Sequence, residues 1–469
     1  MLRTATASAA AADGPTEMPP APDVTHAKRR SRSIRLAVVT SFLSKAGTVL
    51  LQLLSLPVAV RVLGREEFGL YTAVNLSLSM VSLLQVGVGP ALTHGLTRAR
   101  AEDDEGRQRE LGSTAFFMMA GIALLAGLAL AAVLVFVPLP AIYGEAFVGR
   151  ESALRPALWT GLGLFLLLFV LNLTERVREG HLEVASNNLW GAAGNVLAAV
   201  LVGTGVWWIP QVWYLVLAVH GAMVTAKLCN TVTLWRKHPL MRPSLKCFRP
   251  AVARHLFSDG MAFSTCCLVT GIVEYNLCGW MVGRAGGPAD IALYGVFVSL
   301  TIMQLGFVVM LSAPTWPAVA EALARGDLPW ARAAARRLYG FGSAFAVCSA
   351  LGLVGLGPWL LWLWLGGEFS NIGRPMLACY GLYFVAHVWR HLNHAMMIGT
   401  GQVSKLVGIQ LLESAVVAAL AWPALRFGGI SAMLATMGIA ILLLTGTCLP
   451  GRVLRALGRG RSEARAPIL

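Results

Sequence analysis

Long apolar segments alternate with short polar connectors along most of the chain. Each apolar segment has about 20 residues or more, which is enough to cross about 30 Å of hydrocarbon as an α-helix. The pattern predicts twelve spans, at residues 36–60, 68–95, 111–138, 156–174, 184–206, 211–234, 256–282, 291–316, 338–365, 374–395, 402–425 and 428–449. We therefore predict an all-α, polytopic membrane protein.

The composition excludes an ordinary soluble enzyme and a disordered chain. Of the 469 residues, 56% are hydrophobic and 13% are charged, and the mean hydropathy is +0.66. Soluble proteins carry about 25% charged residues, and disordered chains have many charges and few apolar residues. The net charge of +15 does not indicate nucleic acid, because the basic residues lie in connectors, where they meet anionic lipid headgroups.

Basic residues also predict the orientation in the membrane. Most of the 38 Lys and Arg residues lie in the two tails and in every second connector, and such residues favour the cytoplasmic side. Both termini are therefore predicted to be cytoplasmic. We divide the chain into a disordered tail (1–33), an N-terminal six-helix bundle (34–235), a cytoplasmic linker (236–255), a C-terminal six-helix bundle (256–450) and a basic tail (451–469).

An internal repeat relates the two predicted bundles. Three pairs of positions are separated by 221 to 224 residues: Leu70-Tyr71 and Leu293-Tyr294, Pro90 and Pro314, and Gly180 and Gly401. Pairing Gly64 with Gly283 gives a shorter offset and predicts about four inserted residues near Pro288. Six spans separate equivalent points, so the repeats have the same orientation and are expected to enclose a central cavity.

Several segments resemble a known family. They are LPVAVRVLGREEFGLYTAVNLS (56–77), EYNLCGWMVG (274–283), IALYGVF (291–297), PTWPAVAEALARGD (314–327), MIGTGQVSKLVGIQLLESAVVAAL (397–420) and GGISAMLAT (428–436). They are similar to the polysaccharide transporters of the multidrug/oligosaccharidyl-lipid/polysaccharide exporter superfamily, which include O-antigen and exopolysaccharide flippases. Their motifs consist mainly of glycines and packing residues, which specify a fold better than a cargo.

The resemblance implies a function in the synthesis of lipopolysaccharide or exopolysaccharide. A member would lie in the bacterial inner membrane and move undecaprenyl-diphosphate-linked sugars to the outer leaflet, beside the polysaccharide polymerase machinery. It would use a cation-lined cavity and an H⁺ or Na⁺ gradient, without another cofactor. An ion-coupled multidrug or metabolite antiporter of the same fold is the alternative.

Cations within the spans are the candidates for binding a diphosphate, because they are costly to expose to hydrocarbon. Lys45 lies about nine residues inside the first span and Lys227 lies nearer the inner end of the sixth. Snorkelling to the headgroups is the alternative for each. Arg390 and His394 lie on the tenth span, where they could contact the diphosphate or sugar or form an interfacial basic girdle.

Two acidic residues within the spans are candidates for ion coupling or gating. Glu274 lies in the seventh span and Glu413 in the middle of the eleventh. A buried carboxylate could exchange a proton or take Na⁺ during a transport cycle. A structural pair with a lysine or an amide is the alternative for Glu274, and a hydrogen bond to Ser414 or a neighbouring helix is the alternative for Glu413.

Prolines at matching places in the two repeats suggest moving elements. Pro90 and Pro314 are expected to interrupt equivalent spans and to act as hinges.

No pattern in the sequence indicates catalysis. The eight cysteines lack the paired spacing typical of zinc sites, and no nucleotide-binding motif is present. A membrane glycosyltransferase or polymerase would need a large outer loop, but the longest outer connector, at about 139–155, is short.

Overall fold

A computed structural model describes residues 24–81, 88–369 and 372–458, and these residues form helices and short turns without a strand. The helices are α1 (Val24–Val81), α2 (Val88–Ala101), α3 (Glu105–Phe136), α4 (Leu139–Tyr143), α5 (Glu151–Leu171), α6 (Leu173–Gly180), α7 (Val184–Gly205), α8 (Val212–Lys237), α9 (Pro250–Gly271), α10 (Cys278–Gly286), α11 (Pro288–Arg325), α12 (Leu328–Leu365), α13 (Arg374–Gly399), α14 (Val403–Leu443), α15 (Thr445–Cys448) and α16 (Pro450–Gly458).

Short helical turns connect some of these elements. The 3₁₀ turns are η2 (Glu145–Phe147), η3 (Pro239–Met241), η4 (Leu245–Cys247) and η6 (Gly366–Phe369). A π-helical segment, η5 (Ile272–Leu277), joins α9 to α10. Such segments are rare and often occur at functional sites.

The apolar runs predicted from the sequence fall on these helices. Residues 82–87, within the second predicted span, lie outside the described part, as do 1–23 in the predicted tail. Helix α1 already begins at Val24, before the predicted bundle boundary at residue 34. Among the described residues, seven helical stretches are long and apolar enough to cross a membrane. The exposed side chains include Leu125, Phe136 and Phe427, as expected where lipid replaces water.

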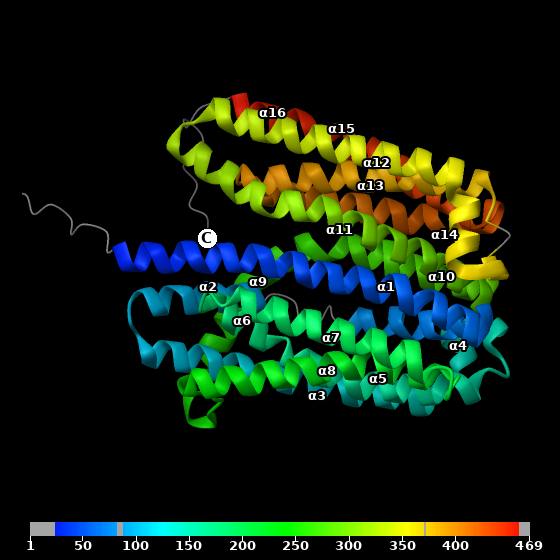
Figure 1. Cartoon of the computed structure of the whole chain (residues 1–469), viewed down its shortest axis with the longest axis horizontal. Helices are drawn as coiled ribbons and strands as arrows, with labels where there is room; N and C mark the ends of the chain where they lie inside the picture. Colours follow the sequence, from blue (N-terminus) through cyan, green and yellow to red (C-terminus); the bar gives the residue numbers. More distant parts are fainter. Residues whose placement is uncertain (1–23, 82–87, 370–371, 459–469) are drawn as a thin grey trace, which may run out of the picture.

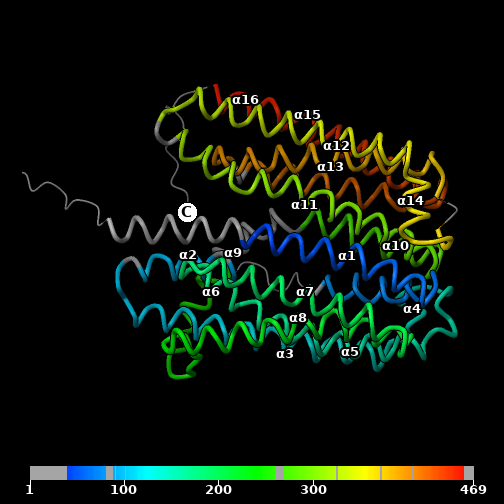
Figure 2. Tube along the Cα trace, viewed as in Figure 1, coloured from blue at the N-terminus to red at the C-terminus, as the bar shows by residue number. Residues whose placement is uncertain are grey.

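The helices pack as two bundles (Figure 1). Helices α2 to α8, with the part of α1 after Gly64, form one bundle, and α10 to α16 form the other. The part of α1 before Gly64 lies between the two bundles, against α7. We call the two bundles the N-terminal and C-terminal lobes. Figure 2 traces the same path, with α9 leading from the first lobe into the second. The parallel relation of the two repeats stays a prediction.

Glycine allows the sharp turns at the end of the molecule far from the termini. Gly64 within α1 has φ 79° and ψ 168°, and Gly287 before α11 has φ 83° and ψ −164°. This conformation is accessible essentially only to glycine. Gly287 is therefore the structural counterpart of Gly64, at an offset close to that of the other pairs. The predicted insertion near Pro288 is wrong, because it paired Gly64 with Gly283 instead.

The two lobes are in direct contact at this same end. The Arg65 Nε donates a hydrogen bond to the Ala289 carbonyl at 3.0 Å, and its guanidinium lies 3.7 Å from the Asp290 carboxylate. Arg284 Nη1 donates to the Ala141 carbonyl at 3.0 Å. Residues 61 to 69 of the quoted family motif therefore form part of the contact between lobes.

Helix α11 continues through two internal prolines. Pro314 and Pro317 both lie inside the helix, which ends at Arg325. Helical geometry is kept on both sides of Pro314, although its nitrogen has no hydrogen to donate to the carbonyl four residues earlier. Pro90 lies in α2, close to residues 82–87, which are outside the described part. A hinge function of Pro90 and Pro314 stays a prediction.

Gly69 provides a test of the contact between the lobes. A Cβ atom added there would overlap the Pro288 carbonyl oxygen, which belongs to the backbone and cannot rotate away. We expect Gly69→Ala to destabilise the detergent-purified protein by about 1–3 kcal/mol, measured by thermal unfolding. Gly121→Ala is the matched control, because a Cβ there meets nothing within 4 Å. Equal stability of both variants would contradict the close approach.

Candidate functional site

Helix α13 carries a row of polar side chains through the C-terminal lobe. Tyr383, His387, Arg390 and His394 follow one another at spacings of four, three and four residues, so they share one helical face. His387 and Arg390 are only 5% and 3% exposed. The face is buried because α13 packs against α11, α12 and α14.

Glu274 is the first partner of this row. It lies in the π-helical segment η5 and accepts hydrogen bonds from Tyr383 Oη at 2.8 Å and Arg390 Nη2 at 3.0 Å. Arg390 Nη1 also donates to the second carboxylate oxygen, which gives the two-pronged geometry that arginine forms with carboxylates. The hydroxyl of Tyr294 donates to the Glu274 carbonyl and so holds the segment in place.

Glu413 on α14 is the second carboxylate. Its Oε1 accepts a hydrogen bond from Arg390 Nη1 at 2.8 Å, and its Oε2 accepts one from the Thr445 hydroxyl. Glu274 and Glu413 are 1% and 0% exposed. One guanidinium thus lies between two buried carboxylates, and full ionisation of all three groups would leave one uncompensated negative charge.

His387 is hydrogen-bonded within this cluster. Its Nδ1 lies 2.9 Å from Glu274 Oε2 and 2.8 Å from Arg390 Nη2. Because Arg390 can only donate and a carboxylate can only accept, a protonated Nδ1 favours Glu274 and an unprotonated Nδ1 favours Arg390. The position of this proton therefore determines which partner His387 bonds.

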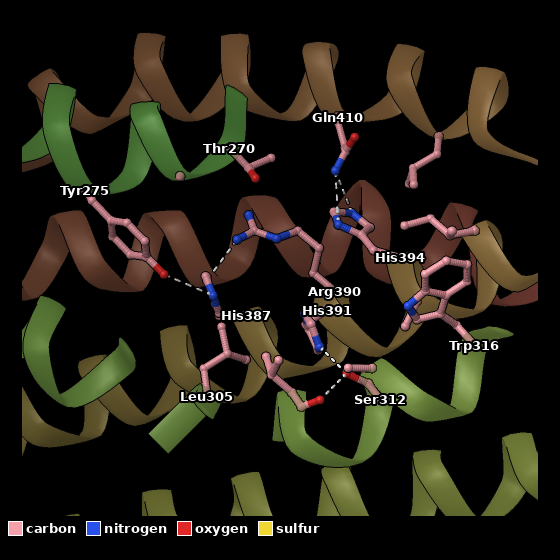
Figure 3. Close-up of a pocket in the computed structure, with 16 residues that line it drawn as sticks. Thr270, Tyr275, Leu305, Ser312, Trp316, His387, Arg390, His391, His394 and Gln410 are labelled. Atoms are coloured by element: carbon pink, nitrogen blue, oxygen red, sulfur yellow. Dashed lines mark hydrogen bonds between the residues drawn. The ribbon is translucent and has the colours of Figure 1, made fainter. Parts of the chain in front are cut away.

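A cavity of about 360 Å³ lies beside the cluster. Figure 3 shows Arg390 and His387 at one part of it and Trp316 at another. His391 Nε2 lies 2.8 Å from the Ser312 hydroxyl, and Gln410 Nε2 lies 3.0 Å from His394 Nδ1. The cavity is lined by Thr270, Gly271, Tyr275, Leu305, Val309, Ser312, Ala313, Trp316, His387, Arg390, His391, His394, Ala395, Ile398, Leu406 and Gln410. Arg390 and His394 therefore line a cavity in the C-terminal lobe, and their predicted contact with the diphosphate or sugar stays a prediction.

Lys45 lies on a polar stripe of α1, outside this cluster. Ser41, Lys45, Thr48 and Gln52 are spaced by four, three and four residues and share one face of the helix. The Lys45 side chain is exposed, and it forms no ion pair or hydrogen bond with any residue that the structure describes. Its predicted contact with the diphosphate stays a prediction.

Lys227 is already paired. Its ammonium contacts the Glu175 carboxylate on α6, and the Glu175 carbonyl accepts a hydrogen bond from Asn187 Nδ2 at 2.9 Å. The ion pair neutralises Lys227 within the N-terminal lobe. Its predicted contact with the diphosphate stays a prediction.

Glu183, in the turn between α6 and α7, joins the ends of three helices. Its carboxylate lies 2.6 Å from Arg178 Nη1, 2.6 Å from Lys237 Nζ and 2.9 Å from His238 Nε2. Burial by itself raises the pKa of Glu183, but the hydrogen bonds from Lys237 and His238 lower this pKa to about 2. The carboxylate therefore remains ionised and stabilises this end of the lobe at neutral pH.

The structure brings together four of the predicted site residues. Glu274, Glu413, Arg390 and His394 lie around one cluster and its cavity, whereas Lys45 and Lys227 lie on other helices. Sequence reasoning missed the roles of Tyr383, Thr445, Tyr275, Gln410 and Trp316. Tyr383 lies four residues before His387 on the same face, and this spacing is the one signal that would have found it.

Comparison with known families identifies the chain. The model of a family described as polysaccharide biosynthesis proteins matches residues 37–322, which is more than half of the sequence. The chain belongs to this polysaccharide biosynthesis family. No curated protein matches this family member in sequence.

Solved transporter structures share the fold of this family member. An inward-facing multidrug resistance MATE family transporter of the MOP superfamily matches with a TM-score of 0.72 and 13% identity, over 90% of this chain and 96% of the other. An outward-facing structure gives a TM-score of 0.62 and 15% identity, over 92% and 97%. A MOP superfamily transporter from Pyrococcus furiosus, with a binding pocket described as reversed in polarity, gives a TM-score of 0.61 and 13% identity, over 92% of this chain and 97% of the other. The chain therefore shares the fold of these transporters.

Removing the Arg390 guanidinium should leave two buried carboxylates without their positive partner. We expect Arg390→Met to lower the free energy of unfolding by about 3–5 kcal/mol, and Glu274→Gln in the same background to recover part of this loss. Thermal unfolding in detergent measures both effects. Arg374→Met is the control, because Arg374 is exposed at the start of the same helix. If Arg390→Met were as stable as Arg374→Met, the ion cluster would not contribute as described.

Proposed function

We propose that this protein is a flippase for undecaprenyl-diphosphate-linked oligosaccharide repeat units used in cell-surface polysaccharide synthesis. Membership of the polysaccharide biosynthesis family supports the cargo class. The observation that carries the proposal is Lys45, a cation on a polar stripe without a partner among the described residues, since a diphosphate needs a positive partner inside the membrane. The protein would act in the bacterial inner membrane, beside the polymerase machinery, with both termini cytoplasmic.

The polar stripe of α1 supports a route for a sugar headgroup. Asn188 and Asn195 on α7 donate hydrogen bonds to Ser41 Oγ and Thr48 Oγ1, both at 2.9 Å. The Oε1 atom of Gln52 is buried and has no hydrogen-bond partner among the described residues. Hydroxyl and amide groups of this kind can exchange hydrogen bonds with sugar hydroxyls, while the polyprenyl chain remains in lipid.

The arrangement of the lobes is consistent with alternating access. The contacts made by Arg65 and Arg284 close the end far from the termini. The inward-facing relative also superposes with a higher TM-score than the outward-facing one, 0.72 against 0.62. We propose that the headgroup binds from the cytoplasmic side and is released after these contacts break.

The C-terminal lobe would couple this motion to an ion gradient. Glu274 and Glu413 provide the carboxylates, and H⁺ and Na⁺ are the candidate ions. Arg390 donates to both carboxylates, so its contact with cargo would require them to be neutralised. His394, Gln410 and Trp316 line the cavity and offer hydrogen bonds and an aromatic face to a sugar ring.

An ion-coupled multidrug or metabolite antiporter is the second candidate. Its support is the fold shared with MATE transporters. A cationic drug would need an unpaired carboxylate, whereas Glu274 and Glu413 are both bonded to Arg390. The exposed cation Lys45 instead favours an anionic cargo.

Lys45 gives a direct mutational test of the proposal. We expect Lys45→Ala to abolish complementation of a deletion strain and Lys45→Arg to retain part of it, because arginine keeps the charge. Lys405→Ala is the control, since Lys405 is exposed at the start of α14. Full activity of Lys45→Ala, at equal protein abundance, would remove Lys45 from the mechanism.

Lipid extraction from a deletion strain tests the cargo. A flippase predicts that a diphosphate-linked repeat unit accumulates on the cytoplasmic side and that the chain restores its export. Mass spectrometry of the extracted lipid would then identify the sugar. Unchanged lipid intermediates together with altered drug sensitivity would instead support the antiporter.

A further inference from the structure

Two carboxylates and one guanidinium in the C-terminal lobe require a further positive charge. Glu274, Arg390 and Glu413 are each at least 97% buried by exposed area, and Arg390 contacts both carboxylates. An uncompensated charge in such a place is costly enough that a group takes up a proton or a cation instead. The cluster is therefore a site for one positive ion.

The groups around the carboxylates favour a proton over Na⁺. A sodium site needs several free oxygen ligands, but the carboxylate oxygens of Glu274 and Glu413 already accept hydrogen bonds from the cluster. Five elements contribute the ionisable groups around the pair and its immediate partners. They are Glu274 and Tyr275 from η5, Cys278 from α10, Tyr294 from α11, Tyr383, His387, Arg390, His391 and His394 from α13, and Glu413 from α14. Most of these groups can donate a proton, and the basic ones oppose a metal cation.

The cavity extends from this cluster toward one end of the lobe. His387 and His394 are seven residues apart on α13, which corresponds to about 10 Å along a helix. His394 lies near the end of α13 at Gly399, Gln410 near the beginning of α14, and Trp316 is 37% exposed. These three positions lie toward the end of the lobe that carries the chain termini. A cavity of about 360 Å³ has room for several waters.

We propose that the coupling ion is a proton held by the Glu274–Glu413 pair, and that it reaches this pair from the side of the termini through the cavity lined by His387, His391 and His394. This assignment rests on the coupling role given to the two glutamates in the proposed function. The step transfers one proton from a hydronium ion of the solvent to a carboxylate through imidazole groups and cavity waters. The hydronium becomes water, each group along the route gains one proton and gives up another, and the carboxylate becomes a carboxylic acid. His387 delivers the proton, because its Nδ1 faces both Glu274 and Arg390.

A route and a binding site have different kinetic signatures. Losing a carboxylate of the site changes how the equilibrium between conformations depends on pH. Losing a residue of the route changes only the rate at which that equilibrium is reached. The response can be followed with a donor and acceptor dye at Arg109→Cys and Arg336→Cys, which are exposed near the same end of the two lobes. All native cysteines are replaced in this background, and the protein is placed in nanodiscs.

We expect a pH jump to change the energy transfer between the dyes. Glu413→Gln should abolish this response. His391→Leu combined with His394→Leu should leave the initial and final energy transfer and the pH midpoint of the change as in the wild type. The change itself should become slower by about tenfold or more. His220→Asn is the control, because His220 is a buried histidine of the other lobe, 2.7 Å from Asn75 Oδ1. Imidazole in the buffer should restore the rate of a His394→Ala variant.

The outcomes separate the two proposals. A wild-type response in Glu413→Gln would overturn the coupling role within the proposed function. A second outcome is that Glu413→Gln abolishes the change in energy transfer while the histidine variants complete this change as fast as the wild type. That outcome would overturn the route alone. A change driven by Na⁺ at constant pH would overturn the assignment of the proton.

Discussion

The contact of Arg390 with two carboxylates is the constraint on which the C-terminal lobe depends. A charged side chain within a membrane is costly, and Arg390 is tolerated because Glu274 and Glu413 surround it. The three residues belong to α13, η5 and α14, so the ion cluster ties together helices that are distant in sequence. Its unequal charge also makes the packing of these helices sensitive to a single proton.

The backbone places this cluster where a change of charge can have a mechanical effect. The π-helical segment η5 interrupts the regular path from α9 to α10, and α10 contributes Arg284 to the contact between the lobes. A shift of Glu274 would therefore pass along a short helix to that contact. Lys45 lies on α1, between the two lobes, so the proposed diphosphate site and the proposed ion site lie on separate elements and would communicate through lobe movement.

The amino-acid sequence predicted the class of fold well because apolar runs and basic connectors report directly on the membrane. It also singled out Glu274, Arg390 and Glu413 as charged residues within spans. It could not predict their pairing, since Glu274 and Arg390 are 116 residues apart. It matched Gly64 to the wrong glycine because residue identity does not reveal that Gly287 has the required positive φ. Tyr383 and Thr445 resemble ordinary packing residues until the carboxylates that they contact are known.

Infrared difference spectroscopy of the purified protein tests the central claim most directly. The protonated and ionised forms of a carboxyl group absorb separately, so spectra recorded at different pH values report protonation of buried glutamates. The account predicts one protonated carboxylic acid band that appears as the pH is lowered and is lost in Glu413→Gln or Glu274→Gln. Spectra without such a band, or a band unchanged in both variants, would contradict the claim that the cluster binds one proton.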